Sequence, residues 1–448
     1  MYSEPESPPM SSSRLRPQSD ATMRAHPDSS DSYGPGERLF ALGLIVWVAL
    51  LGADRVDFLG GQAGFVLTPF LAITPCLLAG EGLRLLSLRV RWRPVGLMAK
   101  RYSALLMALL CVVILSGALG QDVPTSAKRS MHLLVIGCST LVIALTFRGR
   151  PWLGTALARG AELGLVLALV FNLGQLWALT ADGATSLDLG FASVGLEAGR
   201  YAGIVPRLSG QVGDPNRAGL IFLFYLFILA LYGQPGTRRR VSLVLGTVLI
   251  LFTLSRSATL AGAVVFGVWV LARAEIQLSR QAVMVGTMVI TIVSALALAS
   301  PSGRQATVQA LSPLSGRLSL SEGSARDHAY LFQRGVEEGT HSVRRAALGV
   351  GYGNSFRILQ DVFPGNKYGN FHSLYLSMWV ESGVVALLLT LFMLVGPILR
   401  PGPWLPMVAG LWVFNVFYQS SAEPAFWFIL ALAWISSVPR PAAKVATG

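Results

Sequence analysis

Long apolar blocks, separated by shorter polar segments, run along most of the chain. A helix needs about 20 mostly apolar residues to cross a bilayer. Twelve blocks approach that length, near 39–53, 59–80, 103–120, 131–147, 161–180, 218–233, 241–254, 258–272, 282–300, 373–399, 404–419 and 424–438. Each block is apolar throughout, whereas strands of a membrane β-barrel would alternate apolar and polar residues. The pattern predicts an all-α polytopic membrane protein with about twelve transmembrane helices.

The polar segments divide the chain into five parts. Residues 1–36 are rich in Ser, Pro, Asp and Glu and lack an apolar period, which predicts a disordered cytoplasmic tail. Nine helices are expected within 37–300 and three more within 372–438, with a long loop between helices 9 and 10 at 301–371. Residues 439–448 are expected to form a second cytoplasmic tail.

One boundary between two blocks can be interpreted in two ways. Residues 241–272 form either two helices that break at Ser255-Arg256-Ser257 or one long helix that carries a buried arginine. An arginine at the middle of a bilayer is costly. We therefore expect the break, which places Arg256 on a tight turn at the membrane surface.

Charge agrees with this topology and removes nucleic acid from the expected partners. Hydrophobic residues make up 53% of the chain and charged residues only 13%. Of the 36 basic residues, 21 fall in segments that the twelve-helix arrangement places in the cytoplasm, as the positive-inside rule requires. The rule explains the net charge of +13. It also predicts that both termini are cytoplasmic and that the loops 181–217 and 301–371 face the periplasm.

Polar side chains gather in these outward-facing segments and not within the spans. The first group is Arg207-Leu-Ser-Gly-Gln-Val-Gly-Asp-Pro-Asn-Arg217, where Gly and Pro favour a tight turn and Asp214 or Asn216 can cap the next helix. A simple re-entry turn is the structural alternative. The second group is the Arg256 turn, because a guanidinium presents a rigid fork to phosphate oxygens. Its structural alternative is anchoring to lipid headgroups.

Two further groups lie in and after the long loop. Arg326 and His328 belong to a stretch with helical spacing of apolar residues. The Gly-rich stretch 347–354 lacks the Lys-Ser/Thr of a nucleotide P-loop, so we interpret it as a turn that lets backbone segments pack closely. His372 stands where the loop enters a membrane helix and can act as a base near neutral pH, although a lone histidine is often structural.

At these residues the sequence resembles the O-antigen ligase superfamily. Arg256-Ser-Ala-Thr-Leu260 fits the ligase pattern of arginine, three residues and leucine, and His372-Ser373, nine residues and Gly383 fits a second ligase pattern. The Arg207-Leu-Ser-Gly turn with Asp214-Pro-Asn216 is similar to the segment before a mid-chain helix in that family. Two departures stand beside these matches. Ala386 replaces the Gly, Thr or Tyr of the ligase pattern, and neither long loop has the polymerases' Arg with Gly eleven positions later.

The resemblance implies a GT-C-type glycosyltransferase of the bacterial inner membrane with its active site on the periplasmic face. The implied donor is a glycan on undecaprenyl diphosphate, and the implied acceptor is a sugar hydroxyl on lipid A-core or on a second lipid-linked glycan. His372 would be the catalytic base, and three arginines would bind the diphosphate: Arg256, Arg207 and Arg217. Arg326 and His328 are expected glycan contacts. No cofactor is implied, and without an Asp-x-Asp motif or a metal-spaced His/Cys cluster the arginines are expected to replace a metal.

Three alternatives remain at this point. A repeat-unit polymerase of the flippase-dependent pathway would use the same donor. A lipid-linked glycan flippase would need a charged central cavity and related halves, and the predicted spans carry few charges and no such repeat. An envelope scaffold protein would leave the clustered polar groups of the loops without a task.

Overall fold

The computed structural model describes residues 35–58, 67–87, 96–148, 150, 152–180, 185–189, 192–201, 205–273, 323–362, 364–365, 369–399 and 402–436. Three predicted segments lie outside these residues: the span 282–300, most of the N-terminal tail and the tail 439–448. The first part of the predicted long loop, up to residue 322, also lies outside them.

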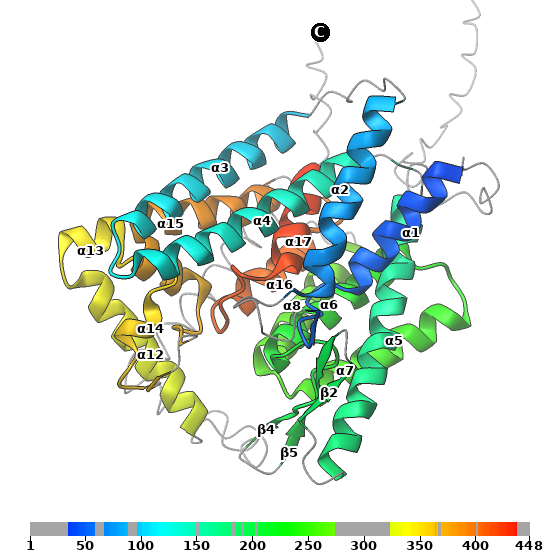
Figure 1. Cartoon of the computed structure of the whole chain (residues 1–448). Coiled ribbons are helices and arrows are strands. Elements are labelled where there is room, and N and C mark those ends of the chain that lie inside the picture. The colour runs from blue at the N-terminus through cyan, green and yellow to red at the C-terminus, as the bar shows by residue number, and fades with distance from the viewer. Residues whose placement is uncertain are drawn as a thin grey trace, which may run out of the picture.

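The described chain is almost entirely helical (Figure 1). The helices are α1 (Pro35–Ala49), α2 (Pro69–Ser87), α3 (Leu97–Ala118), α4 (Val123–Phe147), α5 (Leu153–Thr180), α6 (Pro215–Tyr232), α7 (Thr237–Thr253), α8 (Arg256–Arg273), α12 (Gly323–Thr340), α13 (Val343–Leu348), α14 (Ser355–Ile358), α15 (Leu374–Leu399), α16 (Leu405–Phe414) and α17 (Pro424–Ile435). The strands are β1 (Val56–Asp57), β2 (Ser186–Asp188), β3 (Ser193–Gly195), β4 (Gly199–Tyr201) and β5 (Val205–Arg207).

The protein is a polytopic membrane protein. Five of the described helices are long and apolar enough to cross a bilayer, namely α3, α4, α5, α6 and α15. Other predicted spans correspond to shorter apolar helices, such as α16 with 10 residues and α17 with 12, which are well below the length that a bilayer requires. The helical class is confirmed, and the count of twelve spans stays a prediction.

The expected break near Arg256 is confirmed. Helix α7 ends at Thr253, Leu254 takes the left-handed conformation with φ 49°, and α8 begins at Arg256. The turn therefore brings Arg256 to a helix end and keeps its charge out of the middle of a helix.

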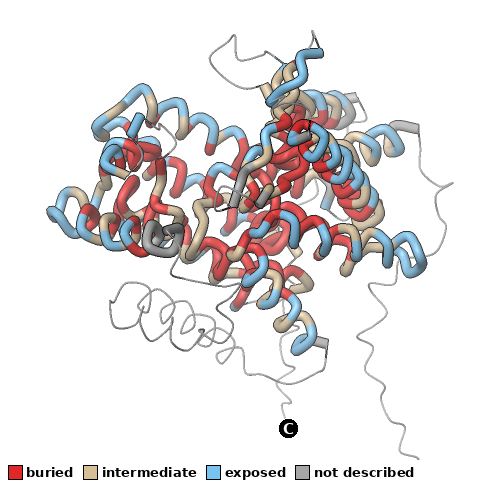
Figure 2. The backbone as a smooth tube through the Cα atoms, turned by 90° about the horizontal axis from the view of Figure 1, so that it is seen from below, coloured by how far each residue is buried: buried red, intermediate tan, exposed pale blue. Residues whose placement is uncertain are grey.

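The core lies where the C-terminal helices pass through the middle of the bundle. Every residue of α17 is buried, and so are most residues of α6. Buried residues gather in the middle of the described part of the chain, and exposed residues lie toward its periphery (Figure 2). Both helices are apolar on all sides, as expected of helices surrounded by protein. Helix α17 packs on α3 and α4, α16 packs on α8, and α6 lies between α5 and α7. The central position of α6 and α17 brings their N-termini close together.

Short strands tie two loops together, which the all-α prediction did not include. Strand β3 pairs with both β1 and β2 in an antiparallel sheet, so residues 56–57 lie against 193–194. Strands β4 and β5 form a hairpin that leads toward α6. Each strand has two or three residues, which is too short for the alternation that reveals strands in a sequence.

Loops predicted to face outward lie together at one end of the bundle. Besides the β1–β3 contact, Gln121 N donates to Val350 O over 3.0 Å, and Arg357 pairs with Asp122 over 2.7 Å. Tyr352 on the same loop lies 3.2 Å from Ser421 Oγ, next to α17. We call this end the loop end, and it comprises the described residues 54–58, 119–122, 186–189, 192–201, 205–217, 254–256, 349–362, 364–365, 369–372 and 415–423.

Segments predicted to face the cytoplasm meet elsewhere. Arg150 pairs with Glu37 over 2.6 Å and with Glu81 over 3.6 Å, which joins the start of α1 to α2 and to the α4–α5 connection. Arg238 at the start of α7 pairs with Glu162 of α5 over 2.5 Å. The alternation of loops inferred from charge thus agrees with the arrangement of the helices, and the side of the membrane that each end faces stays a prediction.

Candidate functional site

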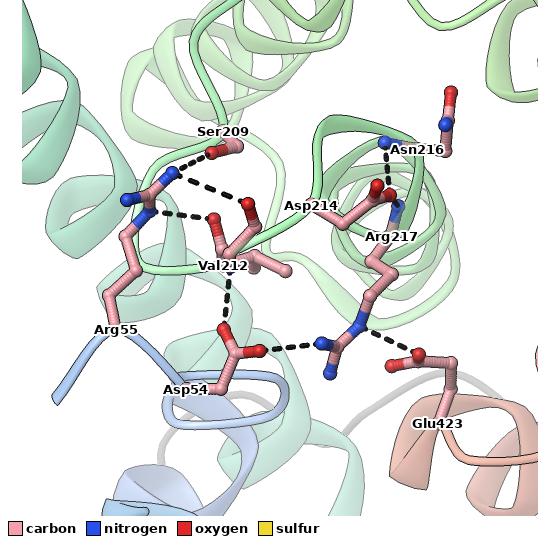
Figure 3. A network of polar contacts seen from close by, with 9 residues as sticks. Asp54, Arg55, Ser209, Val212, Asp214, Asn216, Arg217 and Glu423 are labelled. Atoms are coloured by element: carbon pink, nitrogen blue, oxygen red, sulfur yellow. Dashed lines mark hydrogen bonds and ion pairs between the residues drawn. The ribbon is translucent and has the colours of Figure 1, made fainter. Parts of the chain in front are cut away.

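The segment before α6 forms a tightly bonded turn at the loop end (Figure 3). Asp214 is the N-cap of α6, and its Oδ1 accepts hydrogen bonds from Asn216 N over 2.8 Å and Arg217 N over 2.9 Å. Asn172 of α5 also holds the turn in place, because its side-chain Oδ1 accepts a hydrogen bond from Gly210 N over 2.6 Å. The predicted cap is therefore confirmed, and Asp214 is the residue that provides it.

Arg55 holds the same turn from a different part of the chain. Its guanidinium donates to Val212 O over 2.8 Å and to Ser209 Oγ over 2.9 Å (Figure 3). The neighbouring carboxylate of Asp54 accepts from Gly213 N over 2.6 Å. Sequence reasoning gave Asp54 and Arg55 no role, although a charged pair directly after an apolar block was the available signal.

Arg217 lies between two carboxylates that come from distant segments. Its guanidinium is 2.5 Å from Asp54 Oδ2 and 2.7 Å from Glu423 Oε1 (Figure 3). Arg217 therefore links the α1–β1 connection, the start of α6 and the start of α17. The contact of Arg217 with diphosphate stays a prediction. In this structure its two ion pairs hold these three segments together.

Glu423 is a buried acid with a strongly altered affinity for protons. Its side chain is almost fully buried at the N-cap of α17. Burial raises its pKa from the ordinary 4.5 to about 7, and the nearby charges of Asp54 and Asp214 add to the rise, while Arg217 opposes it. Glu423 therefore keeps its proton to a higher pH than an exposed glutamate does.

We expect the protein to lose stability as the pH rises from about 4.5 to about 7 through Glu423. The folded state binds this proton more tightly than the unfolded chain does, so the stabilisation is complete below the unfolded pKa and disappears as the pH passes the folded pKa. The loss amounts to on the order of 3 kcal/mol. Thermal midpoints measured across this range should fall less steeply in Glu423→Gln. The exposed acid variant Glu337→Gln is the control and should keep the wild-type slope, and an unchanged slope in Glu423→Gln would contradict the assignment.

Arg207 and Arg256 lie at the same turn. Arg207 Nε donates to Thr253 O over 2.9 Å, at the end of α7, and its NH2 donates to Asn216 Oδ1 over 3.1 Å. Arg256 follows Thr253 by three residues and begins α8. Gly219 of α6 allows this approach, because a Cβ there would lie 2.4 Å from Ala258. The structure thus brings together Arg207, Arg256 and the Asp214 cap.

His372 occupies a strained position next to this cluster. Its φ is 50°, and within the described residues only Leu254 shares a positive φ among non-glycine residues. An Asn370 side chain supports the turn, since its Oδ1 accepts from His372 N over 2.8 Å. Burial lowers the pKa of His372 and the charge of Asp214 raises it in part. Strained backbone at both Leu254 and His372 marks two places where tertiary contacts override local preference, as is common at functional sites.

A comparison with protein families finds a match for the part of the chain that contains Arg256 and His372. Residues 241–391 match the family described as O-antigen ligase. The chain carries an O-antigen ligase domain. No curated protein matches the sequence. The matched family comprises ligases and polymerases of surface polysaccharide biosynthesis, and the matched residues include both Arg256 and His372.

Within the O-antigen ligase domain, a backbone crossing determines the direction of α15. Gly383 has φ 84° and interrupts the helix, and a Cβ there would lie 1.9 Å from Ala347 O. The loop that crosses at this point bonds to the interrupted helix, because Val350 N donates to Val380 O and Gly351 N to Glu381 O, each over 2.9 Å. The expectation that the Gly-rich stretch 347–354 allows close backbone packing is confirmed.

The carboxylate of Glu381 completes this crossing. It is fully buried and accepts hydrogen bonds from Gly353 N over 3.0 Å and from the Ser355 hydroxyl. Glu381, the one acidic residue of α15, therefore satisfies backbone and hydroxyl donors of the loop. This crossing anchors the half of α15 that starts directly after His372.

The two predicted glycan contacts are on a different element of the ligase domain. Arg326 and His328 belong to the first turns of α12, where side chains lie outside the described part of the structure. Helix α12 packs on α13 and α15 and lies apart from α6 and α8 in Figure 1. Their contact with glycan stays a prediction.

Proposed function

We propose that the protein is an O-antigen ligase-like glycosyltransferase. It moves a glycan from undecaprenyl diphosphate to a sugar hydroxyl of lipid A-core. The observation that carries the proposal is the meeting of the Arg256 turn and the His372 turn with the Arg207–Arg217 segment at the loop end. Arginine guanidinium groups are suited to binding a phosphate leaving group, and a half-buried histidine is suited to accepting the proton of a hydroxyl nucleophile.

In this mechanism the acceptor hydroxyl attacks the anomeric carbon of the donor sugar while the bond to the diphosphate oxygen breaks. The hydroxyl proton passes to His372, whose lowered pKa keeps the imidazole neutral and ready to accept it. Arg256 and Arg207 stabilise the negative charge that develops on the leaving diphosphate, as preorganised cations do at many transition states. Direct displacement inverts the anomeric centre. The arginines supply the positive charge, so the reaction proceeds without a divalent metal.

Arg217 has a supporting task in this proposal. Its two carboxylate partners hold it at the base of the turn, and Asp54 and Glu423 compete with any phosphate for its guanidinium. Arg326 and His328 would extend the site toward the glycan from α12. Membrane lipids surround the donor's polyprenyl chain.

A repeat-unit polymerase is the second candidate, because the matched family includes both activities. Deletion of the gene, followed by gel analysis of surface glycan and of lipid-linked intermediates, distinguishes them. Loss of a ligase leaves bare core and long chains on undecaprenyl diphosphate. Loss of a polymerase leaves core that carries single repeats. Unchanged glycan on core would reject both.

We expect the loop end to face the periplasm, following the distribution of basic residues. Single cysteines can test this in a variant that lacks Cys76, Cys111 and Cys138. Val343→Cys reports on the long loop, where Val343 is 88% exposed. Thr237→Cys reports on the opposite end and is its matched control. A membrane-impermeant maleimide should label Val343→Cys in spheroplasts and Thr237→Cys only after lysis. The reverse pattern would show that the orientation is wrong.

A further inference from the structure

We propose that Asn415 is a positioning residue for His372. Its side chain folds the α16–α17 connection (415–423) into a bend that links the His372 turn to the segment of Arg217. This inference rests on the proposed function of His372 as a base. It concerns a part of the chain beyond the family match, because the matched residues end at 391.

The connection holds the start of α15 directly after His372. Leu374 N donates to Asn415 O and to Tyr418 O, each over 3.0 Å. The hydroxyl of Ser373 also donates to Asn415 O, over 3.4 Å. The two residues that follow His372 are therefore both bonded to the connection, and the backbone of His372 is fixed through them.

The residue before His372 is fixed from the other side. Phe371 is buried in an apolar cluster with Leu331 of α12 and Leu376 of α15. The φ of 50° at His372 is unfavourable for a non-glycine residue, so this conformation persists only where the surroundings impose it. The connection supplies the polar part of that support.

The side chain of Asn415 gives the connection its shape. Asn415 is fully buried, and its Oδ1 accepts hydrogen bonds from Ser420 N over 3.3 Å and from the Ser420 hydroxyl. Its Nδ2 donates to Leu411 O over 2.9 Å, at the end of α16. The amide thus ties Ser420 to α16 and closes the bend that presents the carbonyls of Asn415 and Tyr418 to α15.

The same bend reaches the arginines. Glu423 N donates to Ser420 O over 2.9 Å, and Glu423 Oε1 lies 2.7 Å from Arg217 Nε. A continuous series of contacts therefore runs from Leu374 through Asn415, Ser420 and Glu423 to Arg217. Asn415 stands in the middle of this series, between the proposed base and the segment proposed to bind the diphosphate.

The proposed displacement depends on this spacing. The acceptor hydroxyl must meet the anomeric carbon on the side opposite to the leaving diphosphate, with the base in reach of its proton. A misplacement of about 1 Å can cost about 10²-fold in rate. Loss of the Asn415 amide leaves the buried donors of Ser420 without their acceptor and releases the bend. The imidazole then keeps its chemistry but loses its fixed place.

Hydrogen exchange in nanodiscs without substrate tests the positioning itself. In Asn415→Ala the peptide that contains residues 372–377 should exchange about 10-fold faster, because local opening of the bend exposes Leu374 N. Ser420→Ala is the milder variant, since it removes one hydroxyl and keeps the backbone donor, and it should show a smaller change of the same kind. The matched control is Thr390→Ala, a buried position on α15 beyond Gly383 whose hydroxyl bonds only within the helix, to Ala386 O over 2.8 Å. It should leave the exchange of this peptide unchanged.

Single-turnover transfer tests the catalytic consequence. The rate constant of Asn415→Ala should fall about 10- to 100-fold, with donor affinity unchanged. A merely structural role would lower the amplitude of the turnover, which counts folded enzyme, and would leave the rate constant as it is. Thr390→Ala should keep the wild-type rate constant.

A double variant tests whether Asn415 acts through His372. In a His372→Asn background the imidazole is absent, so Asn415→Ala should cause little further loss. Residues that act as a unit show this lack of additivity, and independent ones do not.

The outcomes separate this inference from the proposed function. Unchanged exchange in both Asn415→Ala and Ser420→Ala overturns the positioning, whatever the activity. Faster exchange with an unchanged rate constant overturns its catalytic consequence. Losses that multiply in the double variant show that Asn415 acts elsewhere than through His372. A wild-type rate in His372→Asn alone rejects the proposed base, and the exchange result then stands without a catalytic meaning.

Discussion

Replacing His372 with alanine is expected to leave a protein that inserts at normal levels but transfers glycan about 10²–10⁴-fold more slowly. The imidazole is the group that accepts the hydroxyl proton in the proposed displacement, and alanine has none. Donor binding should be nearly unchanged, because the diphosphate is held by the arginines. Single-turnover rates measured beside donor-binding affinities would show a loss confined to the chemical step.

The backbone at His372 calls for a second variant. Its φ of 50° is unfavourable for alanine, whereas asparagine tolerates the left-handed region and cannot act as a base. His372→Asn should therefore be as slow as His372→Ala with less strain. His341→Ala is the control, because His341 is exposed after α12, and it should retain the full rate. Transfer by both His372 variants at the wild-type rate would show that the histidine is structural.

Features with a local cause could be predicted from the sequence. The break before Arg256 follows from the cost of an arginine in a bilayer, and the Asp214 cap follows from Asp-Pro before an apolar run. The glycines of 347–354 indicated close backbone packing, and the contact at Gly349 confirms it, because a Cβ there would lie 2.3 Å from the backbone of Glu381. In each case, the residues that decide the structure are within a few positions of the feature.

Features that depend on distant partners could not be predicted. Nothing near Arg217 in the sequence indicates that Asp54 and Glu423 will be its counter-ions, because the helices α1, α6 and α17 must pack before these residues meet. Composition also does not separate a spanning helix from a buried one. Helices α16 and α17 are the most apolar in character and yet short, since both the protein core and the bilayer select apolar residues.

The glycine of the second ligase pattern has a structural explanation of its own, and its replacement should cause the largest loss of stability. In Gly383→Ala the new Cβ would lie 1.9 Å from Ala347 O, and φ 84° with ψ 174° is a region open almost only to glycine. The crossing loop must move. This movement breaks the hydrogen bonds from Val350 and Gly351 to α15 and leaves the buried Glu381 carboxylate without its donors from the loop. We expect a destabilisation of about 3 kcal/mol or more.

Thermal unfolding of detergent-purified protein measures this effect, with the midpoint of Gly383→Ala well below that of the wild type. Gly267→Ala provides the control, because Gly267 lies within α8 and a Cβ there meets no atom within 4 Å. Alanine at that position should be neutral or stabilise the helix by up to about 1 kcal/mol. Gly383→Ala should also lower the rate of glycan transfer, because the crossing anchors the half of α15 that follows His372. Equal midpoints for the two variants would mean that the backbone crossing at Gly383 is not tight.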